Sequence, residues 1–253
     1  MTTWDQAQYL KFGEQRTRAA EELLARVPLA APQRVVDLGC GPGNSTALLR
    51  ARWPRARLTG IDNSEDMLSR ARRDFPEIEW IQADLQGFRA EGPLDVLFAN
   101  AVMQWLPDHA RLFPALLEQV APGGVLAVQM PSNFAEPSHR AMRELDGPWK
   151  QRTQGVRALT PVADARFYYD LLAPHAQLVD IWQTTYQHVM PNSQAIVDWV
   201  KGTGLRPYLD VLEEEETSAY LDAYTAAIDS AYPARSDGRR LFPFPRLFLV
   251  AIR

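Results

Sequence analysis

The stretch Arg34–Thr46, RVVDLGCGPGNST, constrains the fold more than any other part of the chain. Val35 and Val36 are apolar and β-branched, which favours a buried strand, and Asp37 stands near the end of that strand. Glycines at alternate positions and polar residues that can cap a helix follow: Gly39, Gly41 and Gly43, then Asn44, Ser45 and Thr46. A strand, a glycine turn and a helix N-terminus in this order form a nucleotide-cofactor pocket, because glycine lets the backbone approach a ligand without a Cβ in the way.

The spacing of these glycines differs from the dinucleotide-binding fingerprint. That fingerprint has its third glycine three positions after the second, where this chain has Asn44. The acidic Asp37 before the turn would repel a phosphate and would suit an ammonium group. We therefore expect a cofactor that carries a positive charge. The alternative is a glycine-rich turn that binds no ligand.

Predicted strands alternate with predicted helices along most of the chain, which indicates an α/β fold with a doubly wound parallel sheet. Seven strands are expected, at residues 35–38, 56–62, 78–85, 94–101, 125–130, 178–190 and 244–253. The periodicity also predicts an amphipathic helix over 9–27 and one long helix over 207–233.

We expect a single domain with a core and two insertions. The core takes about residues 30–130, 178–190 and 244–253, and the insertions, about 131–165 and 191–240, form a mostly helical lid. Insertions in this half of the chain can cover the crevice at the strand ends, where open α/β sheets bind ligands.

The composition excludes several classes of protein. The net charge is −4 and the pI about 5.6, whereas proteins that bind nucleic acid through its phosphates normally carry a basic face. No apolar run approaches the roughly 20 residues that span a bilayer, and the N-terminus lacks a signal pattern. The one cysteine, Cys40, excludes an internal disulfide. We expect a soluble cytoplasmic protein that binds neither nucleic acid nor membranes.

The motif DLGCGPGNST, with Asp62 at the end of the next predicted strand, resembles the class I S-adenosylmethionine-dependent methyltransferases. The resemblance implies a seven-stranded Rossmann-like sheet and S-adenosyl-L-methionine as the cofactor. It assigns Asp62 to the ribose hydroxyls, Asp84 to the adenine amino group and the backbone of Asn100 to the methionine portion. The full set of implied cofactor residues is Asp37, Gly39, Gly41, Asn44, Asp62, Asn63, Met67, Asp84, Leu85, Asn100, Ala101, Gln104, Trp105 and Tyr9. On other grounds Asp62 could simply cap a helix and Met67 could belong to the core.

Three further stretches, NAVMQWLPDH, APGGVLAVQMP and WVKGTGLRPYLD, are similar to the members of this family that methylate trans-aconitate. The similarity covers nearly the whole chain. It implies O-methylation of one carboxylate of a small polycarboxylate substrate, with a monomethyl ester and S-adenosylhomocysteine as products. Two alternatives stay open: a carboxyl methyltransferase for another acid, such as malonyl-acyl carrier protein or a lipid acid, and a non-catalytic cofactor-binding regulator.

A carboxylate acceptor is already ionised near neutral pH, so we expect no general base and assign no catalytic residue. Binding the other carboxylates needs cations and hydroxyls, and Lys201, Arg206 and Tyr208 of KGTGLRPY are predicted to bind them. Arginine grips a carboxylate bidentately, and lysine acts as a point charge. Weaker candidates for substrate contacts are Arg246, His139, Trp149, Tyr168 and Tyr169, and the two tyrosines could equally belong to the core. The histidines are too scattered to indicate a metal site.

Overall fold

The computed structural model describes residues 13–156 and 162–253, with side chains from Thr17 on. The chain forms two compact units. The sheet unit comprises Arg16–Pro131, Val162–Thr184 and Arg246–Arg253, and the helical unit comprises the described residues of Met1–Gln15, Ser132–Pro161 and Thr185–Pro245.

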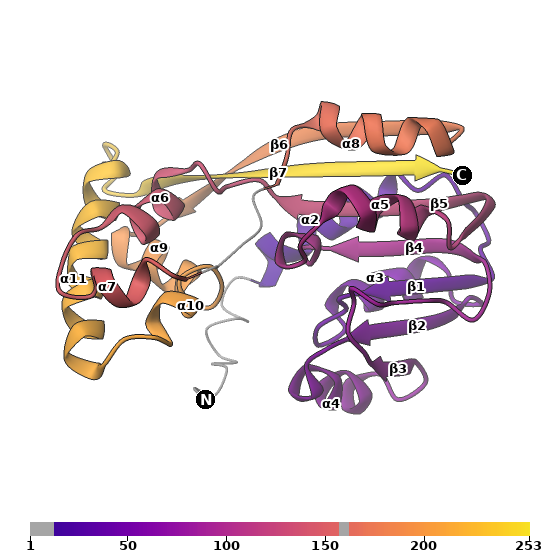
Figure 1. The fold of residues 1–253 in the computed structure, drawn as a ribbon, viewed down its shortest axis with the longest axis horizontal. Helices are drawn as coiled ribbons and strands as arrows, with labels where there is room; N and C mark the ends of the chain where they lie inside the picture. Colours follow the sequence, from indigo (N-terminus) through magenta and orange to yellow (C-terminus); the bar gives the residue numbers. More distant parts are fainter. Residues whose placement is uncertain (1–12, 157–161) are drawn as a thin grey trace. The chain divides into compact units, whose positions relative to one another are not determined.

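A seven-stranded sheet is the framework of the fold (Figure 1). In spatial order its strands are β3 (Glu79–Gln82), β2 (Arg57–Asp62), β1 (Arg34–Leu38), β4 (Leu94–Asn100), β5 (Val120–Pro131), β7 (Arg240–Ile252) and β6 (Leu178–Met190). Neighbours among β1 to β5 pair in parallel, and β7 runs antiparallel to β5. The predicted seven-stranded α/β sheet is therefore confirmed. The direction of β7 differs from that of an all-parallel sheet. The end of β6 and the start of β7 both belong to the helical unit, so the chain enters β7 from the end at which it left β6.

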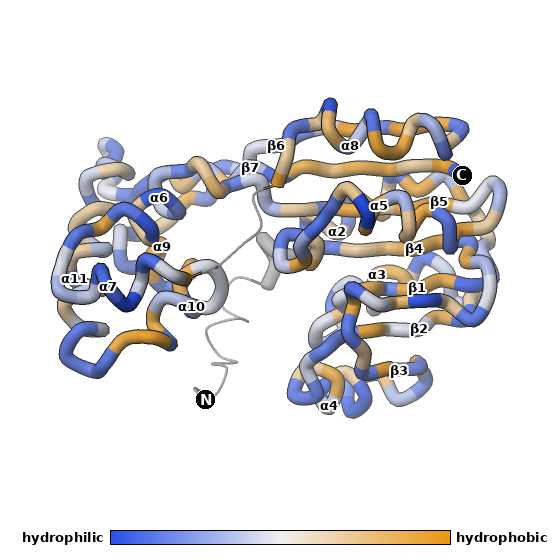
Figure 2. Tube along the Cα trace, viewed as in Figure 1, coloured by the Kyte–Doolittle hydropathy of each residue, from blue (hydrophilic) through white to orange (hydrophobic). Residues whose placement is uncertain are grey.

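Side chains alternate between the two faces of the sheet, and the strand register identifies which residues share a face. Val36, Leu97, Leu126 and Ala251 are cross-strand neighbours on one face. They belong to an apolar cluster that includes residues of α5 (His109–Leu117) and α8 (Ala165–Leu172). Figure 2 shows β4 and β7 as largely hydrophobic strands. Burial of these strands fixes the positions of the residues at their ends.

The other helices of the sheet unit are α2 (Gly13–Ala25), α3 (Asn44–Arg52), α4 (Glu65–Asp74), and the short 3₁₀ helices η1 (Met103–Trp105) and η2 (Ala173–His175). Of these, α3 and α4 connect parallel strands, η1 lies between β4 and β5, α2 precedes β1 and η2 precedes β6. Helix α4 packs against β2 and β3. Ser64 caps α4, because the Met67 backbone N–H donates to its Oγ over 3.4 Å. The sequence NSEDMLSRARRDF predicts a helix that starts at Asn63 or Ser64, and the structure agrees.

The helical unit contains α6 (Pro137–Glu144), α7 (Lys150–Thr153), α9 (Ser193–Lys201), α10 (Arg206–Leu209) and α11 (Glu214–Ala231). Its core is rich in aromatic residues, among them Trp149, Trp199 and Phe242. Two buried tyrosines of α11 bind the backbone of α6: Tyr220 Oη donates to the Met142 carbonyl over 3.0 Å, and Tyr224 Oη to the Ser138 carbonyl over 2.9 Å. These bonds fix α6 and α11 against each other.

The prediction of one long helix over 207–233 is wrong. The chain there forms α10 and α11, separated by four residues. A capping box starts α11: the Glu213 side chain accepts from the backbone of Glu216, whose own side chain accepts from the Glu213 N–H over 3.1 Å. This reciprocal cap favours a fresh helix start over a continuous helix.

Three predicted strands have limits that differ from the structure by more than one residue. Strand β7 begins at Arg240 instead of the predicted 244. Strand β3 covers only residues 79–82 of the predicted 78–85, and β5 begins at Val120, so that the sequence APGG belongs to the strand. After β3 the Asp84 Oδ1 accepts from the Gln86 N–H over 3.1 Å, a local turn that competes with strand pairing.

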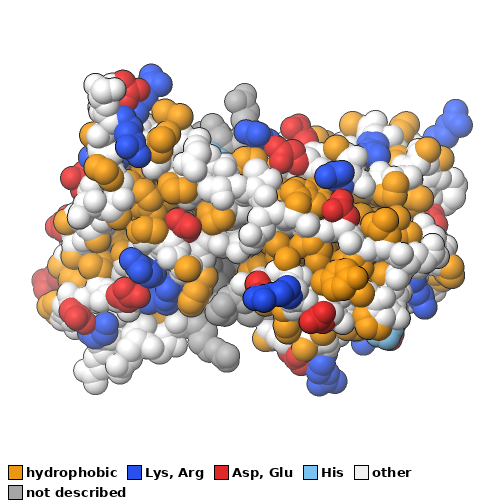
Figure 3. All heavy atoms as spheres, turned by 90° about the horizontal axis from the view of Figure 1, so that it is seen from above, with side chains coloured by type: hydrophobic (Ala, Val, Ile, Leu, Met, Phe, Trp, Pro, Cys, Tyr) orange, Lys and Arg blue, Asp and Glu red, His pale blue; other side chains and the backbone are white. Residues whose placement is uncertain are grey.

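None of the described helices has the length and apolar character needed to cross a membrane. The face drawn in Figure 3 mixes acidic and basic side chains with apolar ones. A mixed surface of this kind agrees with the small net charge of −4.

Candidate active site

Asp37 is the buried acid at the end of β1. Its side chain is 0% exposed, and its Oδ2 accepts hydrogen bonds from Ser45 Oγ over 2.7 Å and from Thr46 Oγ1 over 2.6 Å. Oδ1 has no hydrogen-bond partner among the described residues. Burial raises the pKa of Asp37 from 3.8 to about 6, although the two hydroxyls lower it; Asp62 adds a smaller upward shift. A ligand with a positive charge and an N–H donor for Oδ1 would therefore stabilise the ionised form of Asp37.

The glycine turn after β1 leaves room that a side chain would fill. Gly39 has φ +75°, and a Cβ on it would lie 2.3 Å from Val102 Cγ2. Gly41 has φ +54°, and a Cβ there would meet nothing within 4 Å. Gly39 therefore permits close contact with the segment after β4, whereas Gly41 faces open space.

Asp62, at the end of β2, anchors this turn. Its Oδ2 accepts from the Gly41 N–H and its Oδ1 from the Ser64 N–H, each over 2.9 Å. Each carboxylate oxygen has a second lone pair, so the half-buried side chain retains capacity to accept from a ligand hydroxyl. Asp62 and Asp37 together make this end of the sheet favourable for a positive charge.

A second polar segment follows β4. Ala101 has the left-handed φ of +57°, a strained conformation for a residue with a side chain. Its N–H donates to the Gln129 carbonyl over 2.9 Å, and its carbonyl accepts from Gln104 Nε2 over 2.7 Å. Hydrogen bonds of the N–H and of the carbonyl of Ala101 therefore stabilise this conformation. Asn100 Oδ1 and Gln104 Oε1 are buried and have no partner among the described residues.

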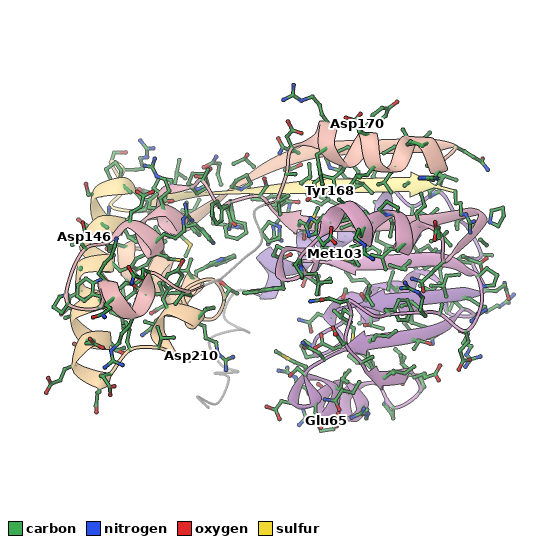
Figure 4. The ribbon with its side chains drawn as sticks, viewed as in Figure 1. Glu65, Met103, Asp146, Tyr168, Asp170 and Asp210 are labelled. Carbon is green, nitrogen blue, oxygen red and sulfur yellow. The ribbon has the colours of Figure 1, made fainter. Side chains whose placement is uncertain are left out.

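A buried histidine fixes the short helix η1, which carries Gln104. His109 Nε2 lies 2.9 Å from the Met103 carbonyl and Nδ1 lies 2.8 Å from Tyr168 Oη. A carbonyl only accepts, so Nε2 carries the proton and Tyr168 donates to Nδ1. Tyr168 Oη in turn accepts from the Ala163 N–H over 3.3 Å. Figure 4 labels Met103 on η1 and Tyr168 on α8.

These observations test whether a cofactor with an ammonium group fits. Three acceptor atoms that have no partner in the described part of the chain lie on the two segments that meet where Gly39 packs against Val102: Asp37 Oδ1, Asn100 Oδ1 and Gln104 Oε1. An ammonium group presents N–H donors and a positive charge. Buried polar atoms without partners are rare in folded proteins. The residues present therefore fit a cationic ligand.

The remaining predicted cofactor residues differ in how far they are exposed. Met67 is half-buried, and Leu85 is buried in the core, whereas Asn44, Asn63, Asp84 and Trp105 are exposed. Tyr9 lies outside the described residues. The predicted helix cap by Asn44, Ser45 or Thr46 is wrong, because the N-cap of α3 is Gly43, with left-handed backbone. The hydroxyls of Ser45 and Thr46 donate to the buried Asp37 carboxylate instead, whereas a cap would use the side-chain oxygen as an acceptor for a backbone N–H.

The predicted substrate residues of the helical unit lie on α6, α7, α9 and α10. Lys201 ends α9 and is half-buried. Arg206 opens α10, and its Nε lies 3.7 Å from Asp210 Oδ2. Tyr208 is buried and stacks on Tyr220, with ring centroids 6.5 Å apart; burial raises its pKa.

Of the weaker substrate candidates, Tyr169 is exposed and the others are buried. His139 packs against the turn after Lys201, because a Cβ on Gly204 would lie 3.2 Å from its Nε2. Burial lowers the pKa of His139 to about 4, so the ring is neutral at physiological pH. Trp149 packs edge-on against Tyr220 in the core of the helical unit. Arg246 lies in the sheet unit, where its Nη1 donates to Gln129 Oε1 over 3.0 Å.

Sequence reasoning missed two further polar residues. Gln129 is fully buried in β5, and its Nε2 has no partner among the described residues. One polar residue in the apolar run VLAVQM was the available signal. Arg143, on α6, lies over the Phe134 ring at 3.8 Å and donates to the His139 carbonyl over 2.8 Å. Its positive charge lowers the pKa of both His139 and Tyr208.

Comparison with known proteins agrees with this arrangement. A family described as "methyltransferase domain" matches residues 35–124. The fold is similar to the YcgJ protein of Bacillus subtilis, with a TM-score of 0.59, 12% identity, and coverage of 93% of this chain and 98% of that one. It is also similar to phosphoethanolamine N-methyltransferase 2 of Haemonchus contortus, with a TM-score of 0.56 and 13% identity over 93% of this chain and 52% of that one.

Fold, glycine turn and acidic strand ends define a class I S-adenosylmethionine-dependent methyltransferase. Two relatives are similar over the full length, and both are named trans-aconitate 2-methyltransferase. The relative from Azoarcus sp. (strain BH72) is 64% identical over 100% of both chains. That from Yersinia pestis (strain Pestoides F) is 56% identical over 99% of this chain and 98% of its own. The chain belongs to the trans-aconitate 2-methyltransferase family.

Proposed function

We propose that the protein methylates one carboxylate of trans-aconitate with S-adenosylmethionine, giving the monomethyl ester and S-adenosylhomocysteine. The observation that carries the methyl-transfer part is the buried Asp37 carboxylate, whose Oδ1 has no partner among the described residues. The choice of acceptor is supported by the relatives that bear this name at 56–64% identity.

The cofactor supplies an electrophilic methyl group on a positively charged sulfur atom. In this proposal the side-chain oxygens Asp37 Oδ1, Asn100 Oδ1 and Gln104 Oε1 accept hydrogen bonds from its ammonium group. Asp62 accepts from the ribose hydroxyls while it holds the Gly41 N–H. The remaining cofactor residues predicted from the sequence stay predictions.

The chain's contribution to the reaction is binding and orientation. An acceptor carboxylate is already ionised at neutral pH, so no residue has to remove a proton. Strong hydrogen bonds to the attacking oxygen would stabilise the ground state more than the transition state, because charge is lost during the reaction. Residues that bind the other carboxylates avoid this cost. Positioning of this kind contributes up to roughly 7–11 kcal/mol.

Lys201, Arg206 and Tyr208 are the proposed contacts for carboxylates in the helical unit. Two of them are cationic side chains that are only half-buried, which suits binding of an anion from solution. Arg143 adds a further positive charge close to Tyr208. The role of the insertions 131–165 and 191–240 as a lid stays a prediction from the sequence.

We also propose a small-molecule acceptor, no nucleic-acid partner and a cytoplasmic location. The net charge of −4 supports the second point. The single, buried cysteine supports the third, because it needs no oxidising compartment.

Transfer of a labelled methyl group tests the function. Trans-aconitate, cis-aconitate, citrate, malonyl-acyl carrier protein and a fatty acid are offered in parallel with labelled S-adenosylmethionine. We expect trans-aconitate to have the highest kcat/KM. Labelling of the carrier protein or the fatty acid alone would contradict the acceptor but keep the cofactor site. Binding of S-adenosylmethionine without labelling of any acid would favour the non-catalytic regulator.

A further inference from the structure

One face of the sheet carries a row of polar side chains among apolar neighbours. Asp37 on β1 lies opposite the residue two positions before Asn100 on β4, and Asn100 is the register partner of Gln129 on β5. Register partners and residues two apart in a strand share a face. Arg246 on β7 lies on this face too, because its register partner is two residues after Gln129. The row therefore runs Asp37, Asn100, Gln129, Arg246.

The basic end of the row is deeply buried, and the amide oxygen of Gln129 there has a hydrogen-bond partner. Gln129 is 0% exposed and Arg246 is 4% exposed. The bond from Arg246 Nη1 uses the amide oxygen of Gln129 and so turns Nε2 away from the guanidinium group. Among the described residues Gln129 Nε2 has no hydrogen-bond partner, and the neighbouring Asn100 Oδ1 has none either.

An unpaired amide in the middle of a sheet destabilises the fold, because it loses its hydrogen bonds to water. Methionine has a similar length and would fill the same space without that cost. Since the amide oxygen already binds Arg246, the two N–H donors of Nε2 are the part of Gln129 that the described residues leave without a partner. A ligand that accepts hydrogen bonds explains them.

Hydrogen-bond acceptors and donors lie at opposite ends of the row, so the two ends suit different ligand groups. Asp37 and Asn100 offer acceptors, whereas Gln129 and Arg246 offer donors. Neighbouring strands lie about 4.8 Å apart, so the backbones of Asp37 and Gln129, two strands apart in the sheet, are separated by roughly 10 Å or more. The ammonium and carboxylate groups of one α-amino acid are attached to the same carbon atom. The separation therefore favours a cationic ligand at Asp37 and a different, anionic ligand at Gln129.

We propose that Gln129, oriented by Arg246, binds a carboxylate of the acceptor other than the one that is methylated. This inference rests on the proposed function and deepens it, because it makes Gln129 a residue that determines specificity for polycarboxylates. The ligand chemistry is a carboxylate, and its other source would be the methionine portion of the cofactor.

The test compares the full-length wild-type protein with Gln129→Glu and Gln129→Met. Glutamate replaces the donor with a negative charge, and methionine keeps the length without donors. Gln119→Glu is the matched control. Gln119 Nε2 donates to the Phe88 and Ala115 carbonyls over 3.2 Å each, at the other end of β5, so this change destabilises the unit without touching the row.

Turnover, calorimetric binding of trans-aconitate to the protein loaded with S-adenosylhomocysteine, and the dissociation constant of S-adenosylhomocysteine are measured for each variant. We expect both Gln129 variants to raise KM for trans-aconitate at least tenfold. The dissociation constant of S-adenosylhomocysteine should stay within about twofold. The preference for trans-aconitate over an unsaturated dicarboxylate should shrink in the same variants, an effect that destabilisation alone would not produce. Gln119→Glu should leave KM and this preference unchanged.

Three results would overturn the inference: an unchanged KM in both variants, an equal rise for Gln119→Glu, or a loss confined to S-adenosylhomocysteine, which would assign the subsite to the cofactor. Failure of the proposed function is a separate result, namely no turnover of any acid by the wild-type protein. In that case the calorimetric comparison still decides whether Gln129 binds a carboxylate. If Gln129→Glu fails to fold, Gln129→Met gives the same decision.

Discussion

Asp37→Asn should stabilise the cofactor-free protein while weakening cofactor binding. The pKa of Asp37 rises from 3.8 to about 6 because the carboxyl is fully buried. Two pKa units correspond to about 3 kcal/mol, which is the cost of keeping Asp37 ionised in the folded state at neutral pH. Asparagine keeps an oxygen that accepts from Ser45 and Thr46, and it carries no charge.

The pH dependence has a definite sign. The folded-state pKa is raised, so the folded protein holds its proton more tightly than the unfolded chain. The cost is absent below pH 3.8, grows between pH 3.8 and 6, and is complete above pH 6. The asparagine variant should therefore be more stable than wild type by up to about 3 kcal/mol at pH 7.5, and by about half as much at pH 5.

Urea unfolding of both cofactor-free proteins at these two pH values measures the effect. Asp66→Asn, an exposed acid in the first turn of α4, is the control and should show no gain. Calorimetry with S-adenosylhomocysteine should show binding that is roughly 10- to 150-fold weaker in Asp37→Asn, since a charge-assisted hydrogen bond contributes about 1.5–3 kcal/mol. A variant less stable than wild type, or equally stabilised at both pH values, would refute the reasoning.

Three further substitutions test other parts of the account. Gly41→Ala and the control Gly123→Ala both place a Cβ in open space at positive φ, so each should lower the unfolding free energy by about 1 kcal/mol. Only Gly41→Ala should weaken S-adenosylhomocysteine binding in calorimetry. Equal binding by the two variants would contradict a ligand at Gly41. Arg206→Ala should raise KM for trans-aconitate strongly with unchanged cofactor affinity. The control Arg152→Ala, which removes an ion-paired arginine of the same unit, should not raise this KM. A parallel loss of substrate and cofactor affinity in Arg206→Ala would argue against a substrate contact. Tyr168→Phe leaves a buried imidazole and a backbone N–H without their partner and should lower the urea-unfolding free energy by about 1–3 kcal/mol; an unchanged value would refute the hydrogen-bond assignment.

The strand–turn–helix motif was predictable because its requirements are local. A β-branched strand, glycines with left-handed backbone and an acid before them follow one another in the sequence, and the structure has Asp37, Gly39 and Gly41 in those roles. Asp62 was predictable for a similar reason, since it directly ends the next strand.

Other features depend on contacts between distant residues. Ser45 and Thr46 have the composition of a helix cap, and only the position of Asp37 shows that their hydroxyls bind a carboxylate. The pairing of Gln129 with Arg246 joins residues 117 positions apart, and no local pattern encodes it. The break between α10 and α11 does have a local signal, the capping box from Glu213 to Glu216, but the helical periodicity on both sides outweighed it in the prediction.

The central claim is tested most directly by identifying the reaction product. The protein is incubated with S-adenosylmethionine and trans-aconitate, and the product mixture is analysed by mass spectrometry. The account predicts a monomethyl ester of trans-aconitate, with one S-adenosylhomocysteine formed for each ester. S-adenosylmethionine that binds but is not consumed in the presence of trans-aconitate would contradict it.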